Sequence, residues 1–142
     1  MRANLYRDVY TIMEDNADLV AALGHTVGAT SLSAGARIIA ANISVFDLPR
    51  PCVVIVGLDN PRDGQSNQKK SILTLEAHGD DVFDTADVID KLECMCDGYR
   101  ANEHTLRGTV HKVAFLDDSF IPTPDPALRM AASQIQIEIT WR

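Results

Sequence analysis

The chain has 142 residues, of which 46% are hydrophobic and 23% charged, which is enough for one domain with its own core. Its net charge of −7, without a lysine–arginine cluster, argues against nucleic-acid binding along a groove or a backbone. No apolar run approaches the length of a membrane span, the charged N-terminus is unlike a signal peptide, and an odd count of three cysteines predicts reduced thiols in place of a disulfide framework.

The first predicted element is a helix over residues 4 to about 23. One apolar stripe recurs there at spacings of three and four, formed by Leu5, Val9, Ile12 and Met13. Asp15 and Asn16 interrupt the pattern, and either residue could cap a short second stretch of helix. Gly24 is placed to end it, and the small and polar residues 24–36 are interpreted as a flexible loop.

Two strands are predicted next. Residues 36–46 have a weak strand pattern, whereas residues 51–58 are apolar on both alternating faces, which is typical of a central strand covered on both sides. Pro51 fits the first position of that strand. The polar residues 59–70 form a connection rich in turn formers that is long for the tip of a hairpin.

The remaining strands are residues 71–78, 106–118 and 134–141, with a proline-rich loop at 120–128. The last strand has the clearest alternation, since Ile135, Ile137, Ile139 and Trp141 alternate with polar residues. We therefore predict a single α+β domain over residues 1–142, with a mostly antiparallel sheet packed on one face by two helices. Exposed edges able to pair with a neighbouring chain are expected at residues 70–78 or 134–141.

A histidine and several carboxylates lie close together between the strand at 71–78 and a predicted helix. They are His78, Asp80, Asp81, Asp84 and Asp87, and they could hold a metal or act as an acid–base pair. The helix must begin near residues 80–84, where an aspartate caps the first turn and others favour its positive end. We predict the structural role, with a buried helix stripe formed by Val82, Ala86, Ile89, Leu92 and Cys96, alongside Val88 and Met95.

Other chemical signatures are missing from the sequence. Cys94 and Cys96 lie two apart in a helical pattern, so they point to different sides and do not readily share a metal. Cys52 lies in an apolar strand, where a thiol is usually inert. We therefore expect no catalytic residue, no metal and no cofactor.

The order of these patterns resembles the tail-terminator, or tail-completion, family of long-tailed bacteriophages over nearly the whole chain. An acidic pair leads into a short apolar turn in LYRDVYTIMEDNADLVAALG, and a proline leads into a hydrophobic strand in LPRPCVVIVGLDN. A strand runs through an acidic turn into a helix in LTLEAHGDDVFDTADVIDKLECM, and the closing strand pair is matched by HKVAFLDD and QIQIEITW. The loops at residues 59–70 and 120–128 are more pronounced than this pattern leads us to expect.

This resemblance implies a structural virion protein and not an enzyme. Such proteins form rings, commonly hexameric, that cap the head-proximal end of the tail tube, stop its growth and join the tail to the head connector. The implied partners are further copies of the chain, the tail tube protein and a head-completion protein. The implied location is the tail or neck of the virion, after assembly in the host cytoplasm. No membrane or sequence-specific nucleic acid is implied, although DNA can pass through the ring.

Two alternatives stay open. The chain could be another neck component, such as a stopper, an adaptor or a head–tail joining protein. It could instead be a small ligand-binding module or enzyme with a pocket around His78, Asp80 and His104. In the virion interpretation, we expect the polar tip of the 59–70 connection to contact an adjoining ring or subunit through Arg62, Asp63, Gln65, Asn67, Gln68, Lys69 and Lys70. An ordinary solvated loop is the alternative for this segment.

Overall fold

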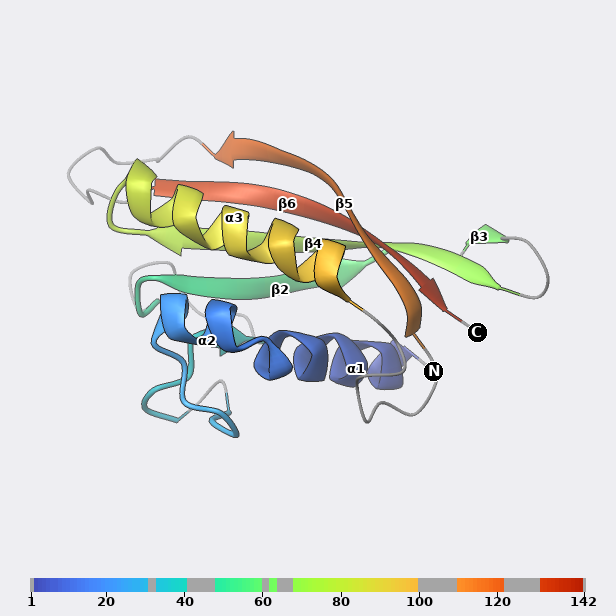
Figure 1. The fold of residues 1–142 in the computed structure, drawn as a ribbon, viewed down its shortest axis with the longest axis horizontal. Coiled ribbons are helices and arrows are strands. Elements are labelled where there is room, and N and C mark those ends of the chain that lie inside the picture. Colours follow the sequence, from blue (N-terminus) through green and yellow to red (C-terminus); the bar gives the residue numbers. More distant parts are fainter. Residues whose placement is uncertain are drawn as a thin grey trace.

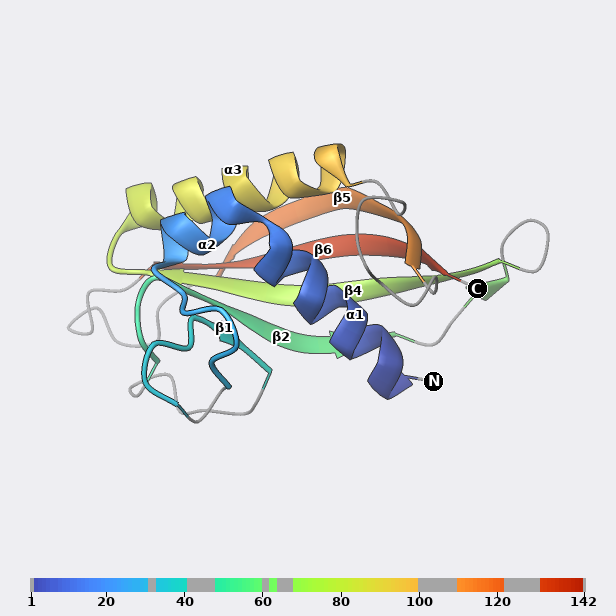
Figure 2. The same cartoon turned by 60° about the horizontal axis from the view of Figure 1, so that its bottom comes forward.

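The computed structural model describes residues 2–30, 33–40, 48–59, 62–63, 68–99, 110–121 and 131–141. These residues form a sheet with helices on one of its faces (Figures 1 and 2), which confirms the predicted α+β class. The elements in chain order are α1 (Arg2–Asp15), α2 (Ala17–Leu23), β1 (Ile38–Ile39), β2 (Cys52–Leu58), β3 (Arg62–Asp63), β4 (Lys69–Gly79), α3 (Val82–Gly98), β5 (Val110–Ile121) and β6 (Ala131–Trp141).

The sheet has the strand order β1-β2-β4-β6-β5, and β3 pairs with the part of β4 that extends beyond β2. All described pairs are antiparallel except β1 with β2, which are parallel. Because β4 pairs with β2 on one side and β6 on the other, and β6 lies between β4 and β5, neither has a free edge along most of its length. The prediction that residues 70–78 or 134–141 form an exposed edge is therefore wrong, and β5 is the long edge strand.

The hydrophobic core lies between the helices and one face of the sheet. The predicted stripe of α1 is fully buried, and it packs against Leu73, Leu75, Ile135, Ile137 and Ile139 from the two central strands. The opposite face of β6 carries the polar side chains of residues 134, 136 and 138. Residues 134 and 138 are partly buried, and residue 136 is exposed. The alternation of the last strand thus predicted correctly which of its faces is covered.

Each helix boundary in the first half of the chain has a local cause. Asn16 caps α2, since its side-chain oxygen accepts a hydrogen bond from the backbone N–H of Leu19 at 2.9 Å. Gly24 ends α2 with a φ of 67°, a left-handed conformation that glycine adopts without strain. The predicted N-terminal helix is therefore two helices, divided where the sequence pattern was interrupted.

The helix α3 begins where the acidic residues predict, and most of its predicted stripe is buried, but the first turn of the stripe is not. The buried residues are Thr85, Val88, Leu92, Met95 and Cys96, whereas Val82 and Ala86 are exposed. The hydroxyl of Thr85 donates to the carbonyl of Asp81 at 3.0 Å and to that of Ala131 at 3.2 Å. These bonds hold the buried Thr85 between the start of α3 and the start of β6, a role that hydrophobic spacing alone does not reveal.

Several strand predictions need adjustment. The strand expected at residues 36–46 is seen only at β1, and residues 41–47 lie outside the described part. The start of β2 is covered on both faces, as predicted, since Cys52 and Val53 are both buried. Covering on both faces ends at a register shift after Ile55, where Val56 is exposed. Residues 120 and 121, predicted to open a proline-rich loop, still pair with β6, and residues 122–128 lie outside the described part.

Where the structure describes the connection predicted at residues 59–70, it continues the sheet. The backbone of Asp59 pairs with Ile72, and β3 then pairs with β4 through Arg62–Lys70 and Asp63–Lys69. The interval between Asp63 and Lys69 is five residues, an ordinary hairpin length. Figures 1 and 2 both show β3 and the start of β4 projecting from one end of the sheet. The described residues of this projection, 62–63 and 68–70, are called the arm below.

Candidate assembly interface

The histidine and the aspartates after β4 do not converge on one point. The Nε2 atom of His78 lies 3.0 Å from the carboxylate of Glu76, its neighbour on the same face of the strand. Asp80 instead forms an ion pair with Arg50 at 3.3 Å. The side chain of Asp81 accepts the backbone N–H of Asp84 at 2.8 Å, which makes Asp81 the predicted helix cap.

The third residue of the alternative pocket, His104, lies outside the described residues. Among the residues that the structure describes, no group of three or more histidine, cysteine, aspartate and glutamate side chains is arranged to hold a metal ion. No helix in the same part of the chain is long and apolar enough to cross a membrane.

The three cysteines have different surroundings. Cys52 and Cys96 are buried, and burial raises the pKa of each thiol to about 12. At neutral pH these thiols stay protonated, and a protonated thiol is a poor nucleophile and metal ligand. Cys94 is exposed, so the two members of the C-x-C pair point to different sides, as the helical spacing predicts.

A small pocket lies in the core between α1, α3 and the sheet. It is lined only by hydrophobic side chains: Val9, Ile12, Met13, Leu73, Leu75, Met95, Val113, Ile137 and Ile139. A ligand site normally adds a few polar groups that orient the ligand. This pocket has none, so we interpret it as an imperfectly filled part of the core.

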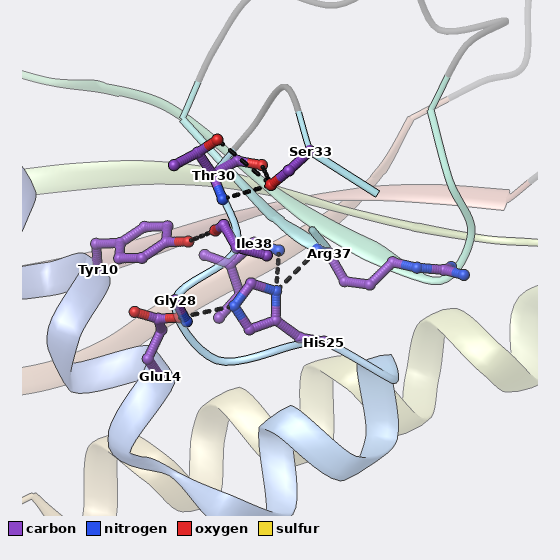
Figure 3. A network of polar contacts seen from close by, with 9 residues as sticks. Tyr10, Glu14, His25, Gly28, Thr30, Ser33, Arg37 and Ile38 are labelled. Carbon is purple, nitrogen blue, oxygen red and sulfur yellow. Dashed lines mark hydrogen bonds and ion pairs between the residues drawn. The ribbon is translucent and has the colours of Figure 1, made fainter. Parts of the chain in front are cut away.

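A buried histidine that sequence reasoning did not single out organises the loop after α2 (Figure 3). The Nε2 atom of His25 lies 2.8 Å from the carboxylate of Glu14, and its Nδ1 atom accepts the backbone N–H of Arg37 at 2.9 Å. The N–H of Ile38 also points to Nδ1, at 3.3 Å. Because Nδ1 accepts from backbone amides, the ring proton lies on Nε2 and is donated to Glu14.

The same network fixes further points of the loop. The carboxylate of Glu14 also accepts the N–H of Gly28 at 2.8 Å, and the hydroxyl of Tyr10 donates to the carbonyl of Ala29 at 2.7 Å. Burial, with a smaller contribution from the charge of Glu14, raises the pKa of Tyr10. The described part of residues 24–36 is thus not the flexible loop that its composition suggested, since small residues here allow close hydrogen-bonded turns.

This network is not a catalytic site. The side chain of His25 is 0% exposed, and both of its ring nitrogens are already hydrogen-bonded. A general base needs a nitrogen that a substrate can reach. The network therefore holds α1 to the start of β1, and no signal in the sequence links two residues eleven positions apart in this way.

A second polar neighbourhood lies where α3 ends. The hydroxyl of Tyr99 donates to the carbonyl of Val110 at 2.9 Å and joins the end of α3 to the start of β5. Burial, and then the nearby charge of Asp8, raises the pKa of Tyr99. These contacts connect α3, α1 and β5, and they stabilise the same end of the sheet from which the arm projects.

The predicted contact residues lie on the arm. Arg62 and Asp63 form β3, Lys69 and Lys70 begin β4, and Gln68 precedes them, while residues 65 and 67 lie outside the described part. Lys69 and Lys70 are exposed, and the ammonium of Lys70 is 3.6 Å from the carboxylate of Glu138. An exposed pair at this distance adds little stability, so both lysines remain accessible to a partner.

The opposite end of the molecule exposes hydrophobic side chains. Val82 and Phe83, in the first turn of α3, are 64% and 84% exposed, and Phe120, near the end of β5, is 63% exposed. Phe120 pairs with Ser133, two residues from Ala131, whose carbonyl accepts the hydroxyl of Thr85. Phe83 and Phe120 are therefore on the two elements, α3 and β5, that flank the start of β6.

Comparison with known proteins found a likeness in fold but none in sequence. Neither the models of known protein families nor the curated protein sequences match the chain. Among solved structures, one chain from the virion of a native gene transfer agent (GTA) particle matches with a TM-score of 0.61. The two chains are 13% identical, and the match covers 94% of this chain and 90% of that one. At this identity the comparison establishes a shared fold over almost the full length of both chains.

Proposed function

We propose that the chain is a structural virion protein and acts as a tail terminator. In this role, copies of the chain form a ring, commonly hexameric in such proteins, that caps the head-proximal end of a tail tube. The ring stops tube growth and offers its other surface to a head-completion protein. The chain would be located in the tail or neck of the particle after assembly in the host cytoplasm.

The observation that carries this proposal is the likeness in fold to a chain of a GTA virion, which extends over 94% of this chain. The resemblance of the sequence pattern to tail terminators independently indicates the same class of particle, a phage-like virion. The described side chains are consistent with a non-enzymatic role, because the candidate acid–base residues serve as a helix cap and as members of separate ion pairs.

The surfaces of the fold suit assembly by contact. An arm projects from one end of the sheet, exposed hydrophobic side chains lie at the other, and β5 is the edge strand among the described residues. Contacts between different surfaces of identical subunits close into a ring when the rotation between neighbours allows it. A ring on a finished tube then multiplies modest contacts by valency, which explains how termination can require a completed tube end.

The alternative is another neck component, such as a stopper, an adaptor or a head–tail joining protein. The likeness in fold to a virion chain supports this role as well as the terminator role. Neither role requires a catalytic or metal site among the described side chains. The two roles differ in what their loss does to tail length. A terminator limits polymerisation, whereas a stopper or adaptor acts after the tail has its final length.

Deleting the gene from a particle-producing genome tests the proposal directly. For a terminator, electron microscopy should show tails longer than those of the parent and not joined to heads. Supplying the chain from a plasmid should restore normal length. Tails of normal length that remain unjoined would favour the alternative neck role.

A second measurement uses purified components. The chain, added to polymerising tail tube protein, should shorten the tubes in proportion to its concentration, and labelled protein should be found at one tube end only. Intact, infectious or gene-transferring particles produced without the chain would contradict every virion role proposed here.

A further inference from the structure

The strand β5 is the outer strand of the described sheet. It pairs with β6 on one side, and no described strand pairs with its other side. Figure 2 shows β5 beyond β6, at the margin of the sheet. The outer edge of such a strand presents backbone N–H and C=O groups that can pair with a further strand. The 12 residues of β5 therefore offer an edge to which another chain can add.

Charge is divided between the two halves of β5. The first half carries His111 and Lys112, and the second half carries Asp117 and Asp118, with no charged residue between them. Lys112 and Asp117 are exposed, and neither forms an ion pair with another described side chain. The carboxylate of Asp117 accepts the backbone N–H of Asp118 at 2.8 Å, a bond that does not neutralise its charge. A second copy of β5 that runs antiparallel to the first therefore brings its acidic half to the basic half of the first.

The register of β5 against β6 places Lys112 and Asp117 symmetrically about Ala114. Ala114 pairs with Glu138, and Lys112 and Asp117 pair with the β6 residues two positions after and two positions before Glu138. A bulge makes this symmetry possible, because Leu116 is an extra residue of β5 at the register shift between Phe115 and Asp117. Without the bulge, residues five apart would point to opposite faces of the sheet. With it, the lysine, the alanine and the aspartate all lie on the face opposite the helices.

We propose that two copies of the chain pair through their β5 edges, antiparallel, about a two-fold axis at Ala114. In this register Lys112 of each copy lies opposite Asp117 of the other, which gives two ion pairs. The small Ala114 meets its own counterpart at the axis, and the two sheets become one continuous sheet. The contact is isologous, since both copies contribute the same surface. It goes beyond the proposed function and does not rest on it, because a ring closes through heterologous contacts.

The distribution of charge selects both the register and the occupant. Opposite charges directly across two antiparallel strands stabilise their pairing, and like charges oppose it. An axis at Asp117 would bring the two aspartates against each other, and an axis at Phe115 would leave Lys112 and Asp117 opposite uncharged residues. A strand from another protein would need the reverse order of charges at the same spacing. A second copy of β5, read antiparallel about Ala114, has that order.

Self-association of the wild-type chain is the first measurement. Sedimentation equilibrium under reducing conditions should show monomers and dimers in an equilibrium that depends on protein concentration. Higher salt should favour the monomer, because ions screen exposed charges. Charged side chains and bulges on an edge strand also serve to block pairing in many proteins. If they guard β5 in this way, the chain stays monomeric up to ~1 mM, and that result would overturn the proposal.

Charge exchange tests the register. Lys112→Glu alone or Asp117→Lys alone places like charges at both ion pairs of the dimer, so each variant should dimerise at least about tenfold more weakly than the wild type. A mixture of the two variants should recover the association, because a heterodimer has opposite charges at both pairs. As a matched control, Asp87→Lys on the exposed side of α3 changes the net charge equally and should not restore association with Lys112→Glu. Single variants that associate as the wild type does, or a mixture no tighter than the singles, would refute the register.

A disulfide at the axis gives an independent readout. In a Cys94→Ser background, Ala114→Cys places one thiol of each copy directly opposite the other, with Cβ atoms ~4.5–5.5 Å apart. Mild oxidation should therefore give a disulfide-linked dimer. Ser119→Cys is the control, because it lies on the same face and is exposed, but its two copies would be ~27 Å apart along the strands. No dimer from Ala114→Cys, or an equal yield from Ser119→Cys, would contradict the axis.

The outcome for this inference is separable from that for the proposed function. Circular dichroism should show the same fold for all variants, so that a loss of association reports on the edge and not on folding. Overlong tails in the deletion strain, together with a monomeric chain, would support the terminator role and refute the β5 contact. A dimer with the predicted charge exchange, together with normal particles in the deletion strain, would establish the contact and refute the virion role.

Discussion

Replacing His25 by alanine should destabilise the fold strongly without removing a chemical activity. The ring is fully buried, and its loss leaves the N–H of Arg37 without its acceptor and the carboxylate of Glu14 without its donor. An unsatisfied buried amide costs ~1–3 kcal/mol, and a hydrogen bond to a charged group contributes ~1.5–3 kcal/mol. Because Glu14 keeps its bond to Gly28, we expect a loss of about 3–5 kcal/mol in the free energy of unfolding.

Urea unfolding followed by far-UV circular dichroism measures this difference at fixed pH. At ~2–4 °C per kcal/mol for a chain of this size, the melting temperature should fall by about 10 °C. A double-mutant cycle with Glu14→Gln should show strong non-additivity, since both changes remove the same bond. Hydrogen exchange at the Arg37 amide should accelerate in the variant.

The reasoning would be refuted if His25→Ala lowered the free energy of unfolding by less than ~1 kcal/mol. A change that small is no larger than that of an ordinary surface substitution. The reasoning would equally fail if His25→Ala abolished a measurable reaction while leaving the unfolding curve unchanged. As a matched control, Thr30→Ala removes only an exposed hydroxyl of the same loop and should change stability by less than ~1 kcal/mol.

Four further outcomes follow from the helix cap, from a close contact and, for the last two, from the thiols. Asp81→Ala should lower the free energy of unfolding, measured with urea, by ~1 kcal/mol because the helix cap is lost. Asp81→Ser, which restores a capping side chain, should recover most of this loss. A stoichiometric metal bound to the wild type, detected by mass spectrometry, would contradict the role of Asp81 as a cap. Gly79→Ala should lower the melting temperature markedly. An added Cβ would lie 2.8 Å from the hydroxyl of Thr85 and 3.0 Å from its backbone nitrogen. A melting temperature equal to that of the wild type would show that this contact can relax. At pH 8 only Cys94 should react with a thiol reagent, whereas Cys52 and Cys96 should react after unfolding, and rapid labelling of all three in the native state would contradict their burial. Since burial raises the pKa of both buried thiols from 9.0 to about 12, the unfolded chain loses these protons first, so stability should be complete below pH 9 and fall toward pH 12 by up to ~1.4 kcal/mol per pH unit and thiol.

The sequence by itself determined the features that depend on neighbours along the chain. The alternation of β6 and the glycine stop at Gly24 were predictable because a strand's faces and a helix's ends depend on nearby residues. The sequence also predicted a cap at Asp15 or Asn16 and one within residues 80–84, and the structure assigns these to Asn16 and Asp81. The helix–strand content and the α+β class follow from these local signals. The structural role of the acidic cluster also followed, since an aspartate at a helix start has a known local purpose.

Only the tertiary structure decided which residues distant along the chain meet. Strand order placed β4 and β6 in the interior and left β5 at the edge, contrary to the prediction, because alternation reports on the two faces of a strand and not on its two sides. The bond from Thr85 to Ala131, 46 positions apart, joins the first turn of α3 to the start of β6. The way α3 lies on the sheet leaves Val82 and Ala86 exposed, although the rest of the predicted stripe is buried or partly buried. The contact of His25 with Glu14 likewise depends on how the chain folds back on itself, a relation that short-range spacing does not encode.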